Sequence, residues 1–207
     1  MLRRTVTLLS LTVVAASSLA AQTGIGLVGG YLSSSVTVDP ATAGIDWSGR
    51  SGFAGGLSLG IGLAGGVSLG VEGLYAQKGA DVHIGSASGA EKLTYLEVPV
   101  TLRIAIGDPK KPHLFVMGGG QYSSLLTCKT VVTGIADVDC KKTATATSGI
   151  KSSDYGVIFG GGVASGRFSL GARYDIGMAN INNDTSAGQS TYKNKAFMVM
   201  LGIGLGK

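Results

Sequence analysis

Large apolar and small residues alternate along residues 53–76 of the chain. From Leu57 to Leu63 every second residue is Leu or Ile, with Ser or Gly between them. After a break at 64–66 the same alternation resumes. A period of two residues places successive side chains on opposite faces of a strand, so this segment predicts two long strands joined by a tight turn.

The second face of these strands consists mostly of Gly, Ser and Ala. A soluble sandwich packs bulky side chains inward and exposes polar ones, whereas a transmembrane barrel turns its apolar side chains toward lipid. The composition agrees with the barrel, with 35 Gly and only 14% charged residues. Beyond the N-terminus no apolar run approaches the roughly 20 residues of a spanning helix. A closed sheet is then the structure that pairs every backbone group within lipid.

The rest of the chain extends this pattern to eight predicted strands. They cover residues 23–34, 51–63, 67–78, 91–106, 113–126, 154–163, 167–181 and 193–206. Each has about ten residues or more, the length that a tilted strand needs to cross a bilayer.

The connections between the predicted strands alternate in length. Long connections lie at 35–50, 79–90, 127–153 and 182–192, and short ones at 64–66, 107–112 and 164–166. This asymmetry is typical of outer-membrane proteins. We therefore predict an all-β fold, a transmembrane up-and-down antiparallel β-barrel of eight strands, with four long extracellular loops and three short periplasmic turns.

The N-terminus has the pattern of a secretory signal peptide. Two arginines precede an apolar stretch over residues 6–16, and small residues follow near Ala20. We expect residues 1–21 to be cleaved on export and residues 22–207 to form the barrel in the bacterial outer membrane. The net charge of +5 at pH 7 includes both arginines. The exported chain is thus only mildly basic, and no nucleic-acid partner is expected.

Aromatic side chains of the predicted outward face gather near the long-loop ends of their strands. They are Tyr31, Phe53, Tyr75, Tyr155 and Phe197. Aromatic rings favour the boundary between lipid and water, so we expect these residues to form a belt. The strand at 113–126 has apolar residues at both parities, and the alternation assigns no face to it.

Charged residues of both signs fall on the predicted inward face. They are Glu72, Glu97, Arg103, Asp154, Arg167, Arg173 and Asp175. Because the interior of an eight-stranded barrel is filled by its own side chains, we expect these groups to pair in a lumen ion-pair network. The alternative is a narrow channel or small-ligand conduit lined by Glu72, Glu97, Arg103 and Arg173.

Cys128 and Cys140 lie in the longest predicted loop. Export to an oxidising compartment predicts a disulfide between them. No histidine lies near them in the sequence, so a metal site is not expected. Neither His83 nor His113 belongs to a Ser and Asp pattern that would supply a catalytic base, and we expect no enzyme activity and no cofactor.

Several segments resemble a known family. They are YLEVPV at 95–100, KPHLF at 111–115, DYG at 154–156 and LGARY at 170–174. Together they resemble the PorT-like outer-membrane β-barrel family of small bacterial barrels. The resemblance implies an eight-stranded barrel in the outer membrane and leaves its activity open.

Three kinds of function follow as hypotheses. The first is a non-enzymatic barrel with a side-chain-filled polar lumen and surface loops for structural or partner-binding roles. It would be monomeric, with outer-membrane lipids and an extracellular or periplasmic protein as partners. The second is the channel or conduit named above. The third is a soluble lipocalin-like carrier, whose large apolar residues would face inward.

Overall fold

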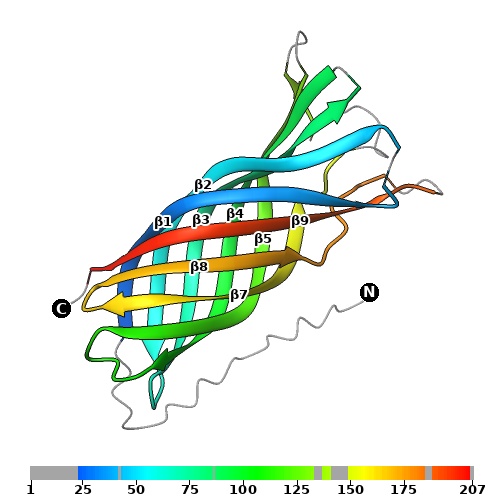
Figure 1. Ribbon diagram of the computed structural model, residues 1–207. Helices are drawn as coiled ribbons and strands as arrows, with labels where there is room; N and C mark the ends of the chain where they lie inside the picture. Colours follow the sequence, from blue (N-terminus) through cyan, green and yellow to red (C-terminus); the bar gives the residue numbers. More distant parts are fainter. Residues whose placement is uncertain are drawn as a thin grey trace, which may run out of the picture.

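The computed structural model describes residues 23–41, 43–85, 87–132, 137–140, 149–184 and 188–205. The regular elements of this part of the chain are strands (Figure 1). They are β1 (Thr23–Asp39), β2 (Ile45–Gly62), β3 (Val67–Ile84), β4 (Ala87–Ile106), β5 (His113–Val132), β6 (Val138–Asp139), β7 (Ser153–Ser165), β8 (Phe168–Gly177) and β9 (Thr191–Gly204). Over these same ranges, no helix has the length and apolar character needed to cross a membrane.

The eight long strands close into a ring. Neighbours pair in the order β4-β3-β2-β1-β9-β8-β7-β5, and β5 pairs again with β4. Every pairing is antiparallel. The two-residue β6 pairs only with β5 and lies outside the ring. Closure leaves the ring without a free edge, which confirms the predicted eight-stranded barrel.

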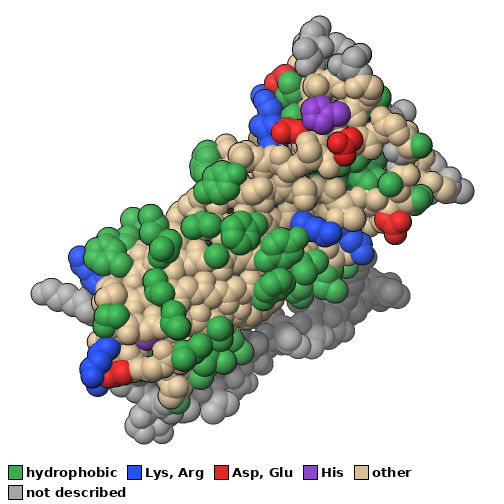
Figure 2. All heavy atoms as spheres, viewed as in Figure 1, with side chains coloured by type: hydrophobic (Ala, Val, Ile, Leu, Met, Phe, Trp, Pro, Cys, Tyr) green, Lys and Arg blue, Asp and Glu red, His purple; other side chains and the backbone are tan. Residues whose placement is uncertain are grey.

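The outer surface of the barrel carries the apolar face of the alternation (Figure 2). Leu57 is 58% exposed and Leu201 is 65% exposed, and both belong to a band of exposed aliphatic and aromatic side chains. The described leucines and valines on this face point away from the axis. A soluble carrier would bury such residues inside, so this finding contradicts the lipocalin-like alternative.

The structure also assigns the faces of β5, which the sequence left open. Leu114, Val116 and Tyr122 are exposed on the outer surface, whereas Phe115 and Gln121 are buried in the lumen. Apolar residues occur at both parities because Phe115 is buried between the exposed Leu114 and Val116.

The long-loop end is the end of the barrel that carries the 40–44, 85–86 and 178–190 connections. Most strands run further than predicted there, but β8 ends at Gly177, short of the predicted residue 181. The predicted loops 35–50 and 79–90 are wrong in extent, because most of their residues continue the hairpins β1–β2 and β3–β4. At the opposite, short-turn end the connection 107–112 agrees with the sequence, and the other two differ from it by a residue or two.

Two irregularities in strand pairing disturb the alternation toward the long-loop end, one in β2 and one in β5. The register of β2 against β3 shifts between Gly49 and Ala54, and the register of β4 against β5 shifts at Thr94 and Tyr95. Each shift is a β-bulge, in which one extra residue reverses the inward and outward phase of the strand beyond it. Alternation that is followed along a strand from its membrane-spanning part therefore assigns the wrong face to residues beyond the bulge.

The interior of the barrel is a packed core. Leu32, Leu74 and Met198 are completely buried, and smaller residues from β2, β3 and β9 fill the space around them. Backbones also approach closely here: a Cβ atom on Gly30 would meet the carbonyl oxygen of Val199. The small inward residues thus fit the dense packing of a narrow barrel.

Candidate functional site

Lys78 lies at the centre of the charged cluster in the lumen. Its ammonium nitrogen is 2.6 Å from Oε1 of Glu97 and 3.5 Å from Oδ2 of Asp175. The side chains of Lys78, Glu97 and Asp175 are 2%, 0% and 1% exposed. Charges this deeply buried need such partners, because each would otherwise lose its hydration without compensation.

Arg173 forms the second part of the cluster. Its Nη1 donates a hydrogen bond of 2.7 Å to Oε2 of Glu72, and its Nε lies 3.5 Å from Oδ1 of Asp175. Asp175 therefore lies between Arg173 and Lys78, and links the two cations. We call Glu72, Lys78, Glu97, Arg173 and Asp175 the lumen cluster.

Neutral polar groups extend the lumen cluster toward the long-loop end. Asn194 donates from Nδ2 to Oδ2 of Asp154 over 2.8 Å, and the same nitrogen lies 3.3 Å from the hydroxyl of Tyr95. Ser123 donates to Oε1 of Glu97 over 3.3 Å. Asp154 thus lies inside the barrel as expected, with an amide as its hydrogen-bond partner.

Two arginines that the sequence assigned to this network form no ion pair with the residues that the structure describes. Arg103 is half-buried, and its guanidinium carbon lies 3.4 Å from the ring centroid of Phe115, a cation–π contact. Arg167 is exposed in the tight turn between β7 and β8, where Gly166 has a positive φ of 57°. The prediction that Arg167 belongs to the network is therefore wrong, because this turn residue makes no ion pair with the described charges.

Lys78 is the residue that the sequence interpretation missed. It is the last residue of the predicted strand 67–78, and it shares the parity of Glu72 and Ala76 on the inward face. Alternation alone could have assigned it to the lumen. A lysine next to a predicted loop suggests solvent, but β3 continues to Ile84 and holds this side chain inside the barrel.

Hollows lie on both sides of the lumen cluster. At the short-turn end a space of about 500 Å³ is lined by small residues of β1, β2 and β9 together with Arg103 and Arg167. At the long-loop end a polar pocket of about 340 Å³ is lined by residues including Trp47, Glu91 and Tyr192. The buried side chains of the lumen cluster separate the two.

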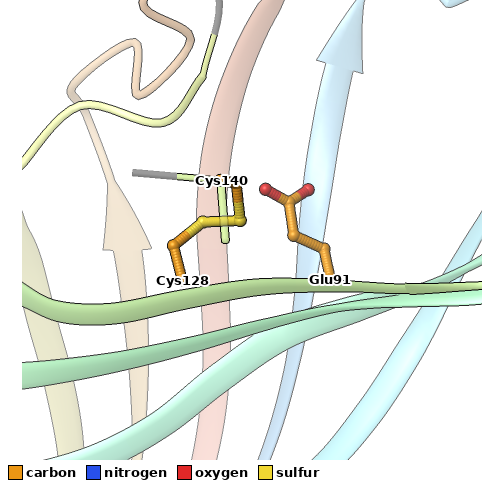
Figure 3. Close-up of side chains that lie close together, drawn as sticks. All are labelled: Glu91, Cys128 and Cys140. Carbon is orange, nitrogen blue, oxygen red and sulfur yellow. A yellow bond between two sulfur atoms is a disulfide. The ribbon is translucent and has the colours of Figure 1, made fainter. Parts of the chain in front are cut away.

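Cys128 and Cys140 form the expected disulfide, which ties the segment at 137–140 to β5. Figure 3 shows Glu91 beside it, and the carboxylate and the two sulfurs lie within 4.8 Å of one another. Three such groups resemble a set of metal ligands, but a metal binds the thiolate form of cysteine. Because both sulfurs are consumed in the disulfide, this trio does not provide thiolate ligands.

The two histidines lie at opposite ends of the barrel. His83 contacts the Ser88 hydroxyl over 3.2 Å, and His113 contacts the Lys111 carbonyl oxygen over 2.8 Å. Both contacts are local and solvent-exposed. Neither imidazole is placed against the lumen cluster, so the described residues offer no histidine base beside these buried carboxylates.

The five predicted belt residues all lie on the outer surface. Tyr31, Phe53, Tyr75, Tyr155 and Phe197 are each exposed. The rings of Phe53 and Tyr75 stack with centroids 5.9 Å apart, and Tyr31 is paired with Phe53 in the β1–β2 register. Tyr122 lies opposite Tyr155 on the adjacent strand and adds a ring that the sequence left unassigned.

The sequence model of a family described as "Outer membrane protein beta-barrel domain" matches residues 16–183, which is most of the chain. The chain belongs to this family. It is an integral protein of the outer membrane, as the sequence predicted. This match shows the outer-membrane β-barrel family and does not distinguish the PorT-like barrels within it.

Three solved structures of outer-membrane proteins are similar to this chain. OprG from Pseudomonas aeruginosa is 14% identical with a TM-score of 0.52, and the alignment covers 89% of this chain and 97% of that one. Neisserial surface protein A is 12% identical with a TM-score of 0.48, covering 87% and 96%. Ail of Yersinia pestis is 14% identical with a TM-score of 0.44, covering 88% and 99%. No curated protein matches the sequence. At these identities the likeness to OprG concerns the fold alone.

Proposed function

We propose that this protein is a non-enzymatic outer-membrane barrel whose lumen is closed by its own side chains. The observation that carries the proposal is that ion pairs cross the full width of the ring. β3 and β8 lie on opposite sides of the barrel, four strands apart in either direction. Two contacts nevertheless join them, Lys78 with Asp175 and Arg173 with Glu72.

A third contact crosses the lumen in another direction. Asn194 on β9 reaches Tyr95 on β4, and these strands are also opposite each other in the ring. Beside these contacts Leu32, Leu74 and Met198 pack together with no exposed surface. An open path for ions would need these contacts to separate, and buried charges separate at a cost of several kcal/mol.

The same geometry bears on the conduit hypothesis. Of its four proposed lining residues, Glu72, Glu97 and Arg173 are held in the lumen cluster, and only Arg103 faces the space at the short-turn end. These groups are engaged with one another and do not form a lined passage. A closed barrel is therefore the proposal that these contacts favour.

We further propose how the barrel sits in its membrane. The exposed apolar band contacts lipid acyl chains, the aromatic belt lies at one boundary, and the long-loop end faces outward from the cell. The protein acts as a monomer and presents its extended hairpins to a protein partner or to the cell surface. On the segments at 95–100 and 170–174, we place it with the PorT-like barrels within its family.

Conductance across a planar lipid bilayer tests the closed lumen. The wild-type protein is expected to insert without channel steps. The double variant Lys78→Ala and Arg173→Ala, which removes both cations that cross the lumen, is expected to give measurable steps if it folds. Arg50→Ala is the matched control, because Arg50 pairs with Asp81 outside the lumen cluster. Regular wild-type steps whose size changes in Glu97→Gln would instead favour the conduit.

A further inference from the structure

The polar pocket at the long-loop end has features that the closed lumen does not explain. Its walls come from four strands and two connections. The strands supply Trp47 on β2, Glu91 on β4, Thr130 on β5 and Tyr192 on β9, and the connections β6–β7 and β8–β9 supply residues including Ile150 and Asn182. It lies beyond the lumen cluster and holds about 340 Å³.

Both β-bulges aim residues into this pocket. Trp47 is six positions from the outward-facing Phe53, and strict alternation would place it on the outer surface. The bulge between Gly49 and Ala54 reverses that phase, so Trp47 lines the pocket. The second bulge does the same on β5, where Thr130 has the parity of the outward-facing Tyr122 but lines the pocket as well. Bulges commonly re-aim side chains beside functional sites.

Glu91 is the pocket's most unusual group. It is only 9% exposed, and its carboxylate has no hydrogen bond or ion pair to any residue that the structure describes. A buried carboxylate is costly unless something compensates its charge. Burial accordingly raises the pKa of Glu91 to about 7. Its side chain extends into the space beside the disulfide (Figure 3), where a ligand could supply the missing positive charge.

The rest of the lining favours a cation over an anion or a neutral sugar. Burial and the charges of Glu91 and Asp184 raise the pKa of Tyr192, so two carboxylates act on this hydroxyl. The described lining contains no Lys, Arg or His. The rings of Trp47 and Tyr192 lie 5.7 Å apart at an angle of 55°. Such a tilted pair forms a corner around a cation and offers no flat platform for a sugar ring.

A second, apolar pocket adjoins the first. It holds about 190 Å³, it shares Trp47, Glu91 and Thr130 with the polar pocket, and aliphatic side chains including Val82 and Val131 line it. A ligand with an apolar body attached to its charged group would fill both spaces.

We propose that this pocket binds a small organic ammonium ion that carries an apolar group. The nitrogen lies against Glu91 and the faces of Trp47 and Tyr192, and the apolar group lies in the adjoining pocket. The inference is independent of whether the lumen conducts, because every residue in it lies at the long-loop end.

Trp47 is the chain's one tryptophan, so its fluorescence reports on the pocket directly. Three probes at pH 8, where Glu91 is ionised, separate the contributions: benzyltrimethylammonium has charge and apolar body, tetramethylammonium has charge alone, and benzyl alcohol has the body alone. We expect saturable fluorescence changes with both cations, at least fivefold tighter for the benzyl compound, and none with benzyl alcohol. Saturation by benzyl alcohol, or none by either cation, would overturn the proposal.

Variants complete the test. Glu91→Gln and Tyr192→Leu are expected to weaken benzyltrimethylammonium binding about tenfold and fivefold. Asp46→Asn is the matched control for Glu91→Gln. It removes the same charge one residue from Trp47, but Asp46 is exposed and is absent from the pocket lining, so binding should stay within twofold. If Glu91→Gln and Asp46→Asn weakened binding equally, general surface charge would explain the effect and the proposal would be overturned.

A lysine side chain of a peptide is the other source of an ammonium group. N-acetyl-lysine amide, titrated in the same way, distinguishes the two sources. Saturation near the concentration required for tetramethylammonium assigns the site to a basic peptide, and saturation by the free cations alone assigns it to a free amine. Either result supports the cation site. The band shift of the folded barrel on unheated gels confirms that each variant is folded.

Discussion

Replacing Lys78 with methionine is expected to be the most damaging single change in the lumen cluster. Lys78 holds Glu97 at 2.6 Å, and no other cation of the described residues pairs with that carboxylate. Asp175 keeps a contact with Arg173. The variant therefore leaves one fully buried carboxylate unpaired, which costs about 3–5 kcal/mol of the free energy of unfolding.

Urea unfolding of the barrel in lipid vesicles, followed by tryptophan fluorescence and by the gel shift of the folded form, measures this loss. Arg50→Met is the control of equal chemistry: its partner Asp81 is 38% exposed and Arg50 itself 27%. Breaking this pair should cost less than about 1 kcal/mol. The double variant Lys78→Met and Glu97→Gln removes both charges and should recover most of the loss. A Lys78→Met variant no less stable than Arg50→Met would refute the reasoning.

Three further predictions concern other parts of the barrel. Replacing Cys128 and Cys140 with serine should lower the local stability of their segment by roughly 2–3 kcal/mol. The segment should then be cleaved faster by protease, while the gel shift of the barrel persists. Because burial raises the pKa of Glu91 to about 7 from 4.5, the folded state binds this proton more tightly, and the free energy of unfolding should fall by roughly 3 kcal/mol as pH rises through that range; a Glu91→Gln variant that keeps the same slope would contradict this. Gly30→Ala should cost more than about 2 kcal/mol, whereas Gly73→Ala, where a Cβ meets nothing within 4 Å, should change stability by less than about 0.5 kcal/mol in the same urea titration.

The barrel itself could be predicted because its strongest signal is local. A period of two fixes which side chains share a face, and the outward Leu57 and inward Ser58 follow directly from it. Turns at the short-turn end could also be predicted from the sequence, because glycines such as Gly65 and Gly66, which adopt a positive φ, occur there. No single segment of the sequence determines the diameter of the ring, because the diameter depends on the number of strands.

The long-loop end could not be predicted in the same way. Each bulge inserts one residue and reverses the phase, so Trp47 and Cys128 face inward although alternation from Phe53 and Tyr122 places them outside. The partners within the lumen were also beyond the sequence. Which charge meets which depends on contacts between strands about 100 residues apart, such as Arg173 and Glu72. The parity of Lys78 was available, but its place at the end of a predicted strand concealed its burial.

The prediction of a signal peptide over residues 1–21 lies outside the described residues and stays a prediction. N-terminal sequencing of the protein purified from outer membranes would test it. We expect the mature chain to begin at or next to Gln22.

The central claim is that the apolar outer face lies in lipid acyl chains and that the lumen face does not. Quenching of a single tryptophan by lipids brominated on their chains tests it directly, in a background where Trp47 is replaced by Phe. Leu57→Trp places the reporter on the exposed face, and Ser58→Trp places it in the space at the short-turn end. We predict strong quenching at 57 and little at 58. Equal quenching at both positions, or stronger quenching at 58, would contradict the account.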